Sequence, residues 1–324
     1  MSDENKMKED ELDRLYYESL SDEVPMKKDS ILPNIVEKYV NSAAEVSMYN
    51  EIPAALTFFV LLGQLSKDMV AIPFGRRVDD TRIQLIWMQT SGTGKSEMYN
   101  FFGPISNYVF NTLNEKHGCN FDVFNVKDIT DAALIGSFEK NKEPVEDENG
   151  QVRMIEVMEA IPGALEGDGL CCYDEFEYSG VFKPSMHKEN VIMYMNTFMN
   201  TIHGQNWVIT VKRKGSEELE CRCQRSIFAT TYIPKTMTSV IAETGIMQRS
   251  ILYIREVPIE IQNELRERLA QTYGKVVDRK APIEQFGKAF VKIYETLMER
   301  YEEVDGDSLS TIKFHESFSD AVVN

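Results

Sequence analysis

The chain has 324 residues and carries 52 acidic against 35 basic side chains, which gives it a net charge of −17. A protein this acidic does not coat nucleic acid through a generally basic surface. Hydrophobic residues make up 43% of the chain and charged residues 27%. This is globular usage, with enough apolar material for a sizeable core.

The amino-terminal residues and the longest apolar run both indicate where in the cell the protein is expected. Residues 1–23 are polar and acid-rich, where a signal peptide would have an apolar stretch. The run 52–65 is too short to cross a bilayer, and Pro53, Gly63 and Gln64 interrupt it. We therefore expect a cytoplasmic protein that does not engage a membrane.

The five cysteines are an odd number and form no CxxC pair, so the sequence indicates neither a disulfide framework nor a zinc ribbon. Cys171 and Cys172 lie in an apolar run and are expected to be buried and inert. Cys221 and Cys223 are two residues apart, which places them on one face of a predicted strand. The four histidines stand at no spacing that would complete a metal site.

The first 80 residues divide into a tail and a helical part. Residues 1–30 contain ten acidic and five basic side chains, so they form either a self-repelling tail or a short helix that orders on a partner. From residue 31, apolar residues recur every three or four positions, which predicts a helix with Pro33 in its first turn. A second apolar helix is expected after Pro53, and both helices should pack on the domain that follows.

The next part, 81–257, alternates apolar strands with helical segments and is predicted to be an α/β core. Its predicted strands are at 83–88, 170–173, 207–211, 219–225, 226–231 and 251–254. Its predicted helices are at 97–109, 131–139, 191–202 and 236–243, with an acidic turn at 146–150. Helices resume at Pro258, so 258–324 is predicted to be a small C-terminal helical part. The sequence ends abruptly, which leaves open the alternative of a truncated chain.

A glycine-rich loop joins the predicted strand 83–88 to the helix after it. In a P-loop, small residues let backbone N–H groups surround phosphates, a lysine reaches the β- and γ-phosphates and a hydroxyl binds magnesium. The residues predicted to hold ATP are Ser91, Gly92, Thr93, Gly94, Lys95, Ser96 and Glu97. Gln89 departs from the general motif, which has a glycine there. The alternative is a chance G-x-G-K-S turn, which the flanking strand and helix disfavour.

Four apolar residues, 170–173, precede Asp174 and Glu175, which is the form of a Walker B strand. Asp174 is predicted to hold Mg²⁺ together with Ser96, and Glu175 is predicted to activate the attacking water. Two adjacent acids favour hydrolysis over kinase transfer. The alternative is a buried strand that simply ends in exposed acids, and the glycine-rich loop in the same chain disfavours it.

Two further positions are predicted to complete the catalytic machinery. Arg249 precedes the strand 251–254, where an arginine of a ring ATPase can stabilise phosphoryl charge in the neighbouring subunit. The alternative is an ordinary surface arginine at the start of a strand. Thr231 or Tyr232, at the end of the strand 226–231, is expected to orient the attacking water, although asparagine is usual at that place.

A basic turn is predicted to form the tip of the hairpin made by 207–211 and 219–225. Salt screens the field of distant acids within about 8 Å, so local positive charge attracts phosphates even in an acidic protein. We therefore predict that Lys212, Arg213 and Lys214 bind single-stranded DNA. The alternative is an ordinary solvated turn.

From about Ile31 onward the chain resembles a family of phage and bacterial P-loop ATPases related to the helicase half of primase–helicase proteins. The resemblance rests on the segments 32–35 (LPNI), 91–96 (SGTGKS) without the first P-loop glycine, 128–134 (DITDAAL), 173–176 (YDEF), 211–215 (VKRKG) and 245–249 (GIMQR). It implies an AAA+/RecA-like core, ATP hydrolysis with Mg²⁺ and action on DNA in replication as a ring, with a hexamer favoured. A zinc ribbon and an acidic primase centre are missing, so a separate primase or loader is implied.

The sequence thus predicts an α/β P-loop ATPase of the additional-strand type. Its predicted function is that of a replicative or accessory helicase, which moves on single-stranded DNA as a homo-oligomeric ring, in the host cytoplasm if a phage encodes it. One alternative is a motor with the same core that packages duplex DNA or remodels a partner. Another is a nucleotide-gated scaffold. The negative charge predicts weak DNA attachment by the monomer, so tight binding would require assembly.

Overall fold

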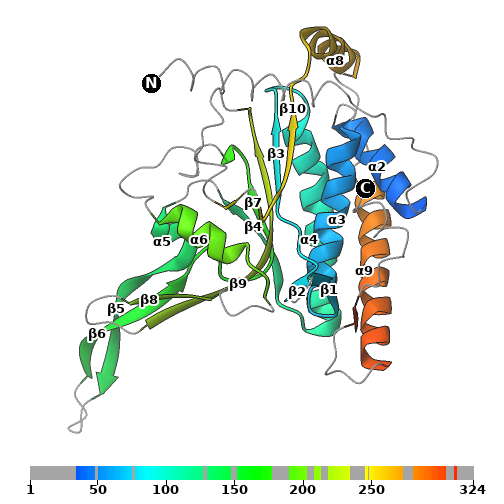
Figure 1. Ribbon diagram of the computed structural model, residues 1–324. Coiled ribbons are helices and arrows are strands. Elements are labelled where there is room, and N and C mark those ends of the chain that lie inside the picture. The colour runs from blue at the N-terminus through cyan, green and yellow to red at the C-terminus, as the bar shows by residue number, and fades with distance from the viewer. Residues whose placement is uncertain are drawn as a thin grey trace, which may run out of the picture. The chain divides into compact units, whose positions relative to one another are not determined.

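The computed structural model describes residues 34–47, 50–74, 77–126, 130–146, 152–176, 190–202, 208–212, 218–233, 245–246, 248–272, 280–303 and 310–311 (Figure 1). The predicted acidic tail 1–30 and the predicted helix 236–243 lie outside these residues. The chain divides into two compact units, Met1–Lys38 and Tyr39–Asn324, and 34–38 is the described part of the first. In the part of the chain that is described, no helix is both long and apolar enough to span a membrane.

Five parallel strands form the centre of the second unit, in the order β10–β3–β9–β7–β4 (Figure 1). A further strand, β8, pairs with β9 in the antiparallel sense. Their bounds are β3 Leu85–Gln89, β4 Phe121–Val126, β7 Gly167–Tyr173, β8 Val208–Lys212, β9 Glu218–Thr231 and β10 Ile251–Arg255. The protein is therefore an α/β protein with a mostly parallel central sheet, as predicted.

Two helices, α3 (Glu51–Ser66) and α4 (Lys95–His117), lie against one face of this sheet, and α9 (Lys280–Glu303) packs on both of them. Side chains alternate along a strand, and β9 directs Phe228 to this face, where its ring meets Phe102 of α4 with centroids 5.3 Å apart. Tyr39 lies in α2 (Asn34–Val46), is fully buried, and makes edge contacts with the rings of Phe58 and Phe101 at 5.3 and 5.4 Å. Aromatic packing thus fixes α3 and α4.

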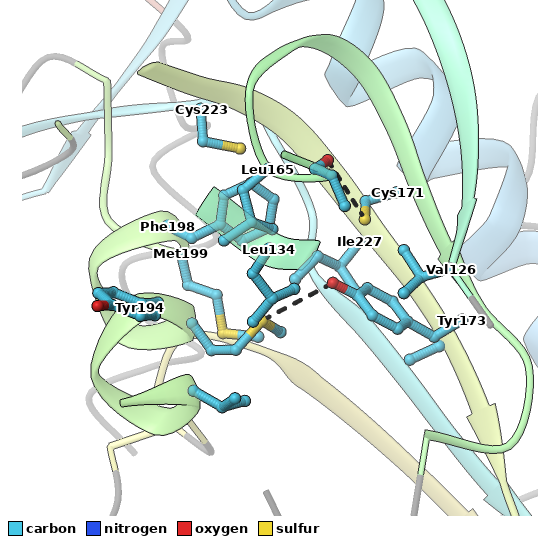
Figure 2. Packing of buried hydrophobic residues seen from close by; sticks show 14 of the residues in the cluster. Val126, Leu134, Leu165, Cys171, Tyr173, Tyr194, Phe198, Met199, Cys223 and Ile227 are labelled. Atoms are coloured by element: carbon cyan, nitrogen blue, oxygen red, sulfur yellow. Dashed lines mark hydrogen bonds between the residues drawn. The ribbon is translucent and has the colours of Figure 1, made fainter. Parts of the chain in front are cut away.

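Helices α5 (Asp131–Ile135) and α6 (Val191–Phe198) contribute to the core on the other face of the sheet (Figure 2). In this core the Tyr173 hydroxyl donates to the Met195 sulfur and the Cys171 thiol donates to the Ala164 carbonyl, both at 4.0 Å. Burial raises the pKa of the Cys171 thiol to about 11. Cys172 is buried as well, which confirms the prediction of two buried thiols.

A two-stranded ribbon takes the place of part of the predicted helix 131–139. The helix ends at Ile135 because Gly136 adopts a left-handed conformation, with φ of +104°. The strands β5 (Gly136–Glu146) and β6 (Val152–Pro162) follow and pair in the antiparallel sense along their whole length. The prediction of a helix through residue 139 was therefore wrong.

The structure also differs from the predicted elements elsewhere. β4 was not among the predicted strands, and α6 ends at Phe198, four residues before the end of the predicted helix 191–202. The strands predicted at 219–225 and 226–231 are one strand, β9, of 14 residues, because neither glycine nor proline interrupts it. The part predicted to be helical, 31–80, also contains a strand pair, and a short strand near the C-terminus joins it: β1 (Val70–Phe74), β2 (Arg77–Asp80) and β11 (Ser310–Thr311). After β10, α8 (Ile259–Thr272) and α9 are helices as predicted.

Candidate functional site

The glycine-rich loop, 90–94, lies between the carboxyl end of β3 and the start of α4. From β3 the chain runs through α4 to β4 at one edge of the sheet, whereas β10 lies on the other side of β3. Parallel α/β sheets bind ligands beyond the carboxyl ends of their strands, where connections diverge in this way. The loop is therefore at the place in the sheet where a ligand is expected.

Two glycines of the loop have left-handed backbones. Gly92 has φ of +72°, and an added Cβ would meet nothing within 4 Å. Gly94 has φ of +94°, and a Cβ there would lie 2.3 Å from the carbonyl oxygen of Ser47. Only glycine fits at position 94, because a side chain would add a main-chain collision to backbone strain. α4 begins directly after Gly94, so the positive end of its dipole lies at the loop.

Gln89 stands where the general P-loop motif has its first glycine, and its side chain is buried inside the loop. Its amide nitrogen donates to Thr93 Oγ1 at 2.8 Å and to Asn50 Oδ1 at 2.9 Å. Its amide oxygen accepts a hydrogen bond from the Trp87 indole at 2.8 Å. Thr93 Oγ1 in turn donates to the Thr90 carbonyl at 2.6 Å. The glutamine therefore braces the loop from within and satisfies buried polar groups.

Asn50, which precedes α3, ties the loop to the N-terminal helices. Its buried amide nitrogen donates to the Thr93 carbonyl at 2.7 Å and to the Ser47 carbonyl at 2.5 Å. On the other side of the loop, the Val257 amide donates to Thr90 Oγ1 at 3.0 Å. The sequence reasoning missed Asn50, because an asparagine before a helix is usually a cap, whereas this side chain makes no capping hydrogen bond.

Lys95 begins α4 and turns its side chain back over the loop. Its ammonium donates to the carbonyl oxygens of Gln89 at 2.7 Å and of Thr90 at 3.0 Å. Burial lowers the pKa of Lys95 to about 8, although the nearby Asp174 carboxylate opposes this shift. A phosphate beside the ammonium would favour its charged form further. Ser96, the next residue of the helix, is exposed.

Asp174 follows β7, and β9 separates that strand from β3. Its carboxylate nonetheless acts electrostatically on Lys95, so the fold brings together the two residues that the sequence predicted as phosphate and magnesium ligands. Thr230 of β9 donates its hydroxyl to Asp174 Oδ1 at 3.0 Å. The Thr230 side chain is buried, whereas Asp174 is exposed, so the hydroxyl fixes one carboxylate oxygen, and the other accepts no hydrogen bond from the described residues.

Glu175 has an unusual backbone. Its φ is +57°, and among the described residues it is the only one other than glycine with a positive φ. Such a conformation costs on the order of 1–3 kcal/mol and is found where the surrounding structure imposes it, often at functional sites. The side chain is exposed beside Asp174 at the carboxyl edge of the sheet. This is the place that a base acting on a bound ligand would need.

Thr230 contacts Asp174, the acid that follows β7, whereas Thr231 was the residue predicted to orient the attacking water. Thr231 is the last residue of β9, pairs in register with Met88 and is buried. Neighbouring residues of a strand point to opposite faces, so Thr231 lies on the face away from Thr230. A role of Thr231 or Tyr232 in orienting water stays a prediction. The alternation of β9 could have indicated Thr230, had the face that carries Asp174 been known.

Arg249 lies at the other end of the strands. The Ile251 amide, two residues on, donates to the Gln84 carbonyl at 2.7 Å, just before β3 begins. Five residues of parallel strand span roughly 13–17 Å, so the amino edge of β3 is about this far from the glycine-rich loop. The structure therefore brings Lys95 and Asp174 together, and it leaves Arg249 apart from them at the opposite edge.

The predicted basic turn joins β8 to β9, and the register of the two strands pairs Lys212 with Glu218. Arg213 and Lys214 lie outside the described residues, so the predicted contact of this turn with DNA stays a prediction. The antiparallel pairing confirms the hairpin itself.

No model of a protein family matches the chain, and a search of curated proteins found no significant match.

Proposed function

We propose that the protein is a P-loop ATPase in which Lys95 and Asp174 act on the same bound ATP. The observation that supports this most is the approach of the two side chains across β9 at the carboxyl edge of the sheet. P-loop ATPases of the additional-strand type have one strand between the strand that leads into the P-loop and the strand that ends in the acids. Here β9 lies in that position, between β3 and β7. The strained Glu175 beside them adds a candidate base.

Each residue has a distinct task in this proposal. The amides of 92–96 and the Lys95 ammonium bind the phosphates, and phosphate oxygens replace the two loop carbonyls that now accept from the lysine. Glu175 accepts the proton of the water that attacks the γ-phosphate. Thr230 holds Asp174 in place. Gln89 and Asn50 keep the loop in its shape before ATP arrives.

The residues at the loop also fit magnesium. Mg²⁺ prefers oxygen ligands, and the exposed Ser96 hydroxyl and Asp174 carboxylate would supply them. When bound, the ion would neutralise charge on the phosphates. The Thr230 hydrogen bond to Asp174 Oδ1 would keep this carboxylate oriented for its role.

Arg249 is proposed to act on the ATP of a neighbouring subunit. Its place at the amino edge, opposite Lys95, argues against action within one chain. In a closed ring each head-to-tail interface joins the amino edge of one subunit to the loop of the next and makes one complete site. An arginine supplied in this way increases the rate of phosphoryl transfer by about 10³-fold or more.

We further propose that the motor moves on single-stranded DNA as a helicase, in a homo-oligomeric ring for which a hexamer is favoured. The basic residues Lys212, Arg213 and Lys214 are clustered in an acidic chain, which supports binding to single-stranded DNA. A separate primase or loader would start the process. The proposed compartment is the cytoplasm, that of the host if a phage encodes the protein.

A motor that remodels a protein partner is a second candidate, because of the ribbon β5–β6. Val152, Met154 and Ile155 are 65%, 60% and 45% exposed, and residues 136–162 contain seven acidic and three basic side chains. Apolar and acidic groups suit contact with a protein better than contact with DNA.

ATP hydrolysis and strand separation by the full chain test the proposal. We expect ATP turnover with Mg²⁺ that single-stranded DNA stimulates more than duplex DNA does, and ATP-dependent unwinding of a forked substrate. Neutralising Lys212, Arg213 and Lys214 together should weaken DNA binding and flatten its salt dependence, while hydrolysis without DNA persists. Stimulation by duplex alone would favour packaging, and no effect of either DNA would favour remodelling. Very slow hydrolysis with nucleotide-dependent partner binding would favour a scaffold.

A further inference from the structure

The guanidinium of Arg249 is held from two sides at the amino edge of the sheet. Nε donates to Asn200 Oδ1 at 2.9 Å, and Nη1 donates to the Gly245 carbonyl at 3.0 Å. Nη2 has no hydrogen-bond partner within the described part of the chain, and the side chain is exposed. A guanidinium fixed through two nitrogens can present the third, in a set direction, to a group outside the subunit.

The main chain of Asn200 is itself anchored by a buried ion pair. Arg82 Nη2 donates to the Asn200 carbonyl at 2.6 Å, and Arg82 Nε donates to Asp80 Oδ1 at 2.9 Å. The side chains of Arg82 and Asp80 are 1% and 4% exposed. Asp80 also accepts from the Ile202 amide at 2.8 Å, so the segment after α6 is held at two points. The side chain of Asn200 therefore starts from a fixed backbone when it meets Arg249.

Gly245 is adapted to the same contact. Its φ is +76°, and an added Cβ would lie 2.7 Å from Arg249 Nη1. A side chain here would strain the backbone and push the guanidinium away. The absence of a Cβ thus allows the carbonyl of Gly245 to receive Nη1 at hydrogen-bond distance.

We infer that Asn200 and Gly245 form a seat that aims Arg249 at the phosphates held by the neighbouring subunit. The inference rests on the proposed function, in which Arg249 acts across the interface. Asn200 and Gly245 are positioning residues, because they touch the arginine and not the nucleotide. The seat opens on a cavity of about 710 Å³ lined by Asn200, Arg249 and Ser250, so the guanidinium is accessible from outside the subunit.

The Asn200→Ala variant tests the seat, because it removes the oxygen that receives Nε and leaves the carbonyl that receives Arg82. We expect the kcat of the assembled full chain to fall about 10- to 100-fold, since small misplacement of a transition-state group has effects of this size. The KM for ATP should stay within about twofold, because the nucleotide is held by the loop of another subunit. Steady-state hydrolysis at saturating Mg²⁺ measures both.

Three further variants decide between a seat and a general structural role. Asn200→Asp keeps an oxygen acceptor for Nε and should restore most of kcat, and the double variant Asn200→Ala/Arg249→Ala should be no slower than Arg249→Ala alone. Gln248→Ala removes an exposed amide from the same cavity and should leave kcat unchanged. If Arg249→Ala lowers kcat and Asn200→Ala does not, the seat is wrong while the proposed function stands. If Arg249→Ala has no effect, the seat and the proposed role of Arg249 across the interface are both wrong.

Discussion

Replacing Lys95 with alanine is expected to abolish measurable ATP hydrolysis and to weaken ATP binding by about 10- to 100-fold. The reason is the loss of charge-assisted hydrogen bonds to phosphate, worth about 1.5–3 kcal/mol each. The ammonium is already partly desolvated over the loop, with a pKa lowered by burial to about 8, so a phosphate is the partner that favours its charge. Calorimetric titration with ATP and Mg²⁺ measures the affinity, and a phosphate-release assay measures hydrolysis.

Lys116→Ala is the matched control for this variant. Lys116 is in the last turn of the same helix, is 54% exposed and pairs with Glu295 at 3.1 Å. This exposed pair contributes about 0–1 kcal/mol, so the control should bind and hydrolyse ATP as the wild type does. The Lys95→Ala protein should unfold within a few degrees (about 2–4 °C) of the wild type, because no core packing is lost. Undiminished hydrolysis by Lys95→Ala would exclude the loop as the ATP site.

Replacing Glu175 with glutamine is expected to slow hydrolysis by about 10²- to 10⁴-fold, the usual contribution of a general base. The affinity for ATP should stay within about twofold, because Glu175 is proposed to act on water and not on the phosphates. The substitution keeps the size of the side chain and leaves the positive φ of this position as it is. Single-turnover hydrolysis measures the chemical step, and nucleotide titration measures affinity.

Glu284→Gln provides the control for the loss of one carboxylate. Glu284 lies on α9, where it pairs with Lys288 on the exposed surface of the helix. This variant should hydrolyse ATP at the wild-type rate. A Glu175→Gln protein with an unchanged chemical step would mean that another group activates the water, or that the acid after Asp174 is only the exposed end of a strand.

The main elements of the site could be predicted from local sequence. Buried parallel strands have continuous apolar runs, which made β3 and β7 evident, and the glycines between β3 and α4 indicated a tight loop. The left-handed φ of Gly92 and Gly94 is what such a loop requires. Because both strands end at the same edge of a parallel sheet, the approach of Asp174 to Lys95 also followed from the sequence.

The supporting contacts could not be predicted, because they depend on which side chains meet in three dimensions. Gln89 and Asn50 are 39 residues apart in the chain and form one hydrogen-bonded pair in the loop. The choice between Thr230 and Thr231 depends on which face of β9 lies toward Asp174, and local sequence does not set that face. The seat of Arg249 likewise joins Asn200 after α6 to a residue before β10.

The ribbon β5–β6 was missed for a different reason. The segment 131–139 begins with residues typical of a helix, and only Gly136 marks the change to a strand. Val152 and Met154 are apolar but exposed, so the pattern of apolar residues in β6 does not distinguish an exposed ribbon from a buried strand.

Mixing two inactive variants tests most directly the claim that one ATP site is built from two subunits. The Glu175→Gln protein lacks the base, and the Arg249→Ala protein lacks the arginine. A complete site forms where an Arg249→Ala subunit binds the ATP and supplies Glu175, and a neighbouring Glu175→Gln subunit supplies Arg249. Random assembly of equal amounts makes about one interface in four complete, so hydrolysis should return to about a quarter of the wild-type rate. If no ratio of the two proteins hydrolyses ATP faster than either alone, Arg249 does not complete a site across the interface.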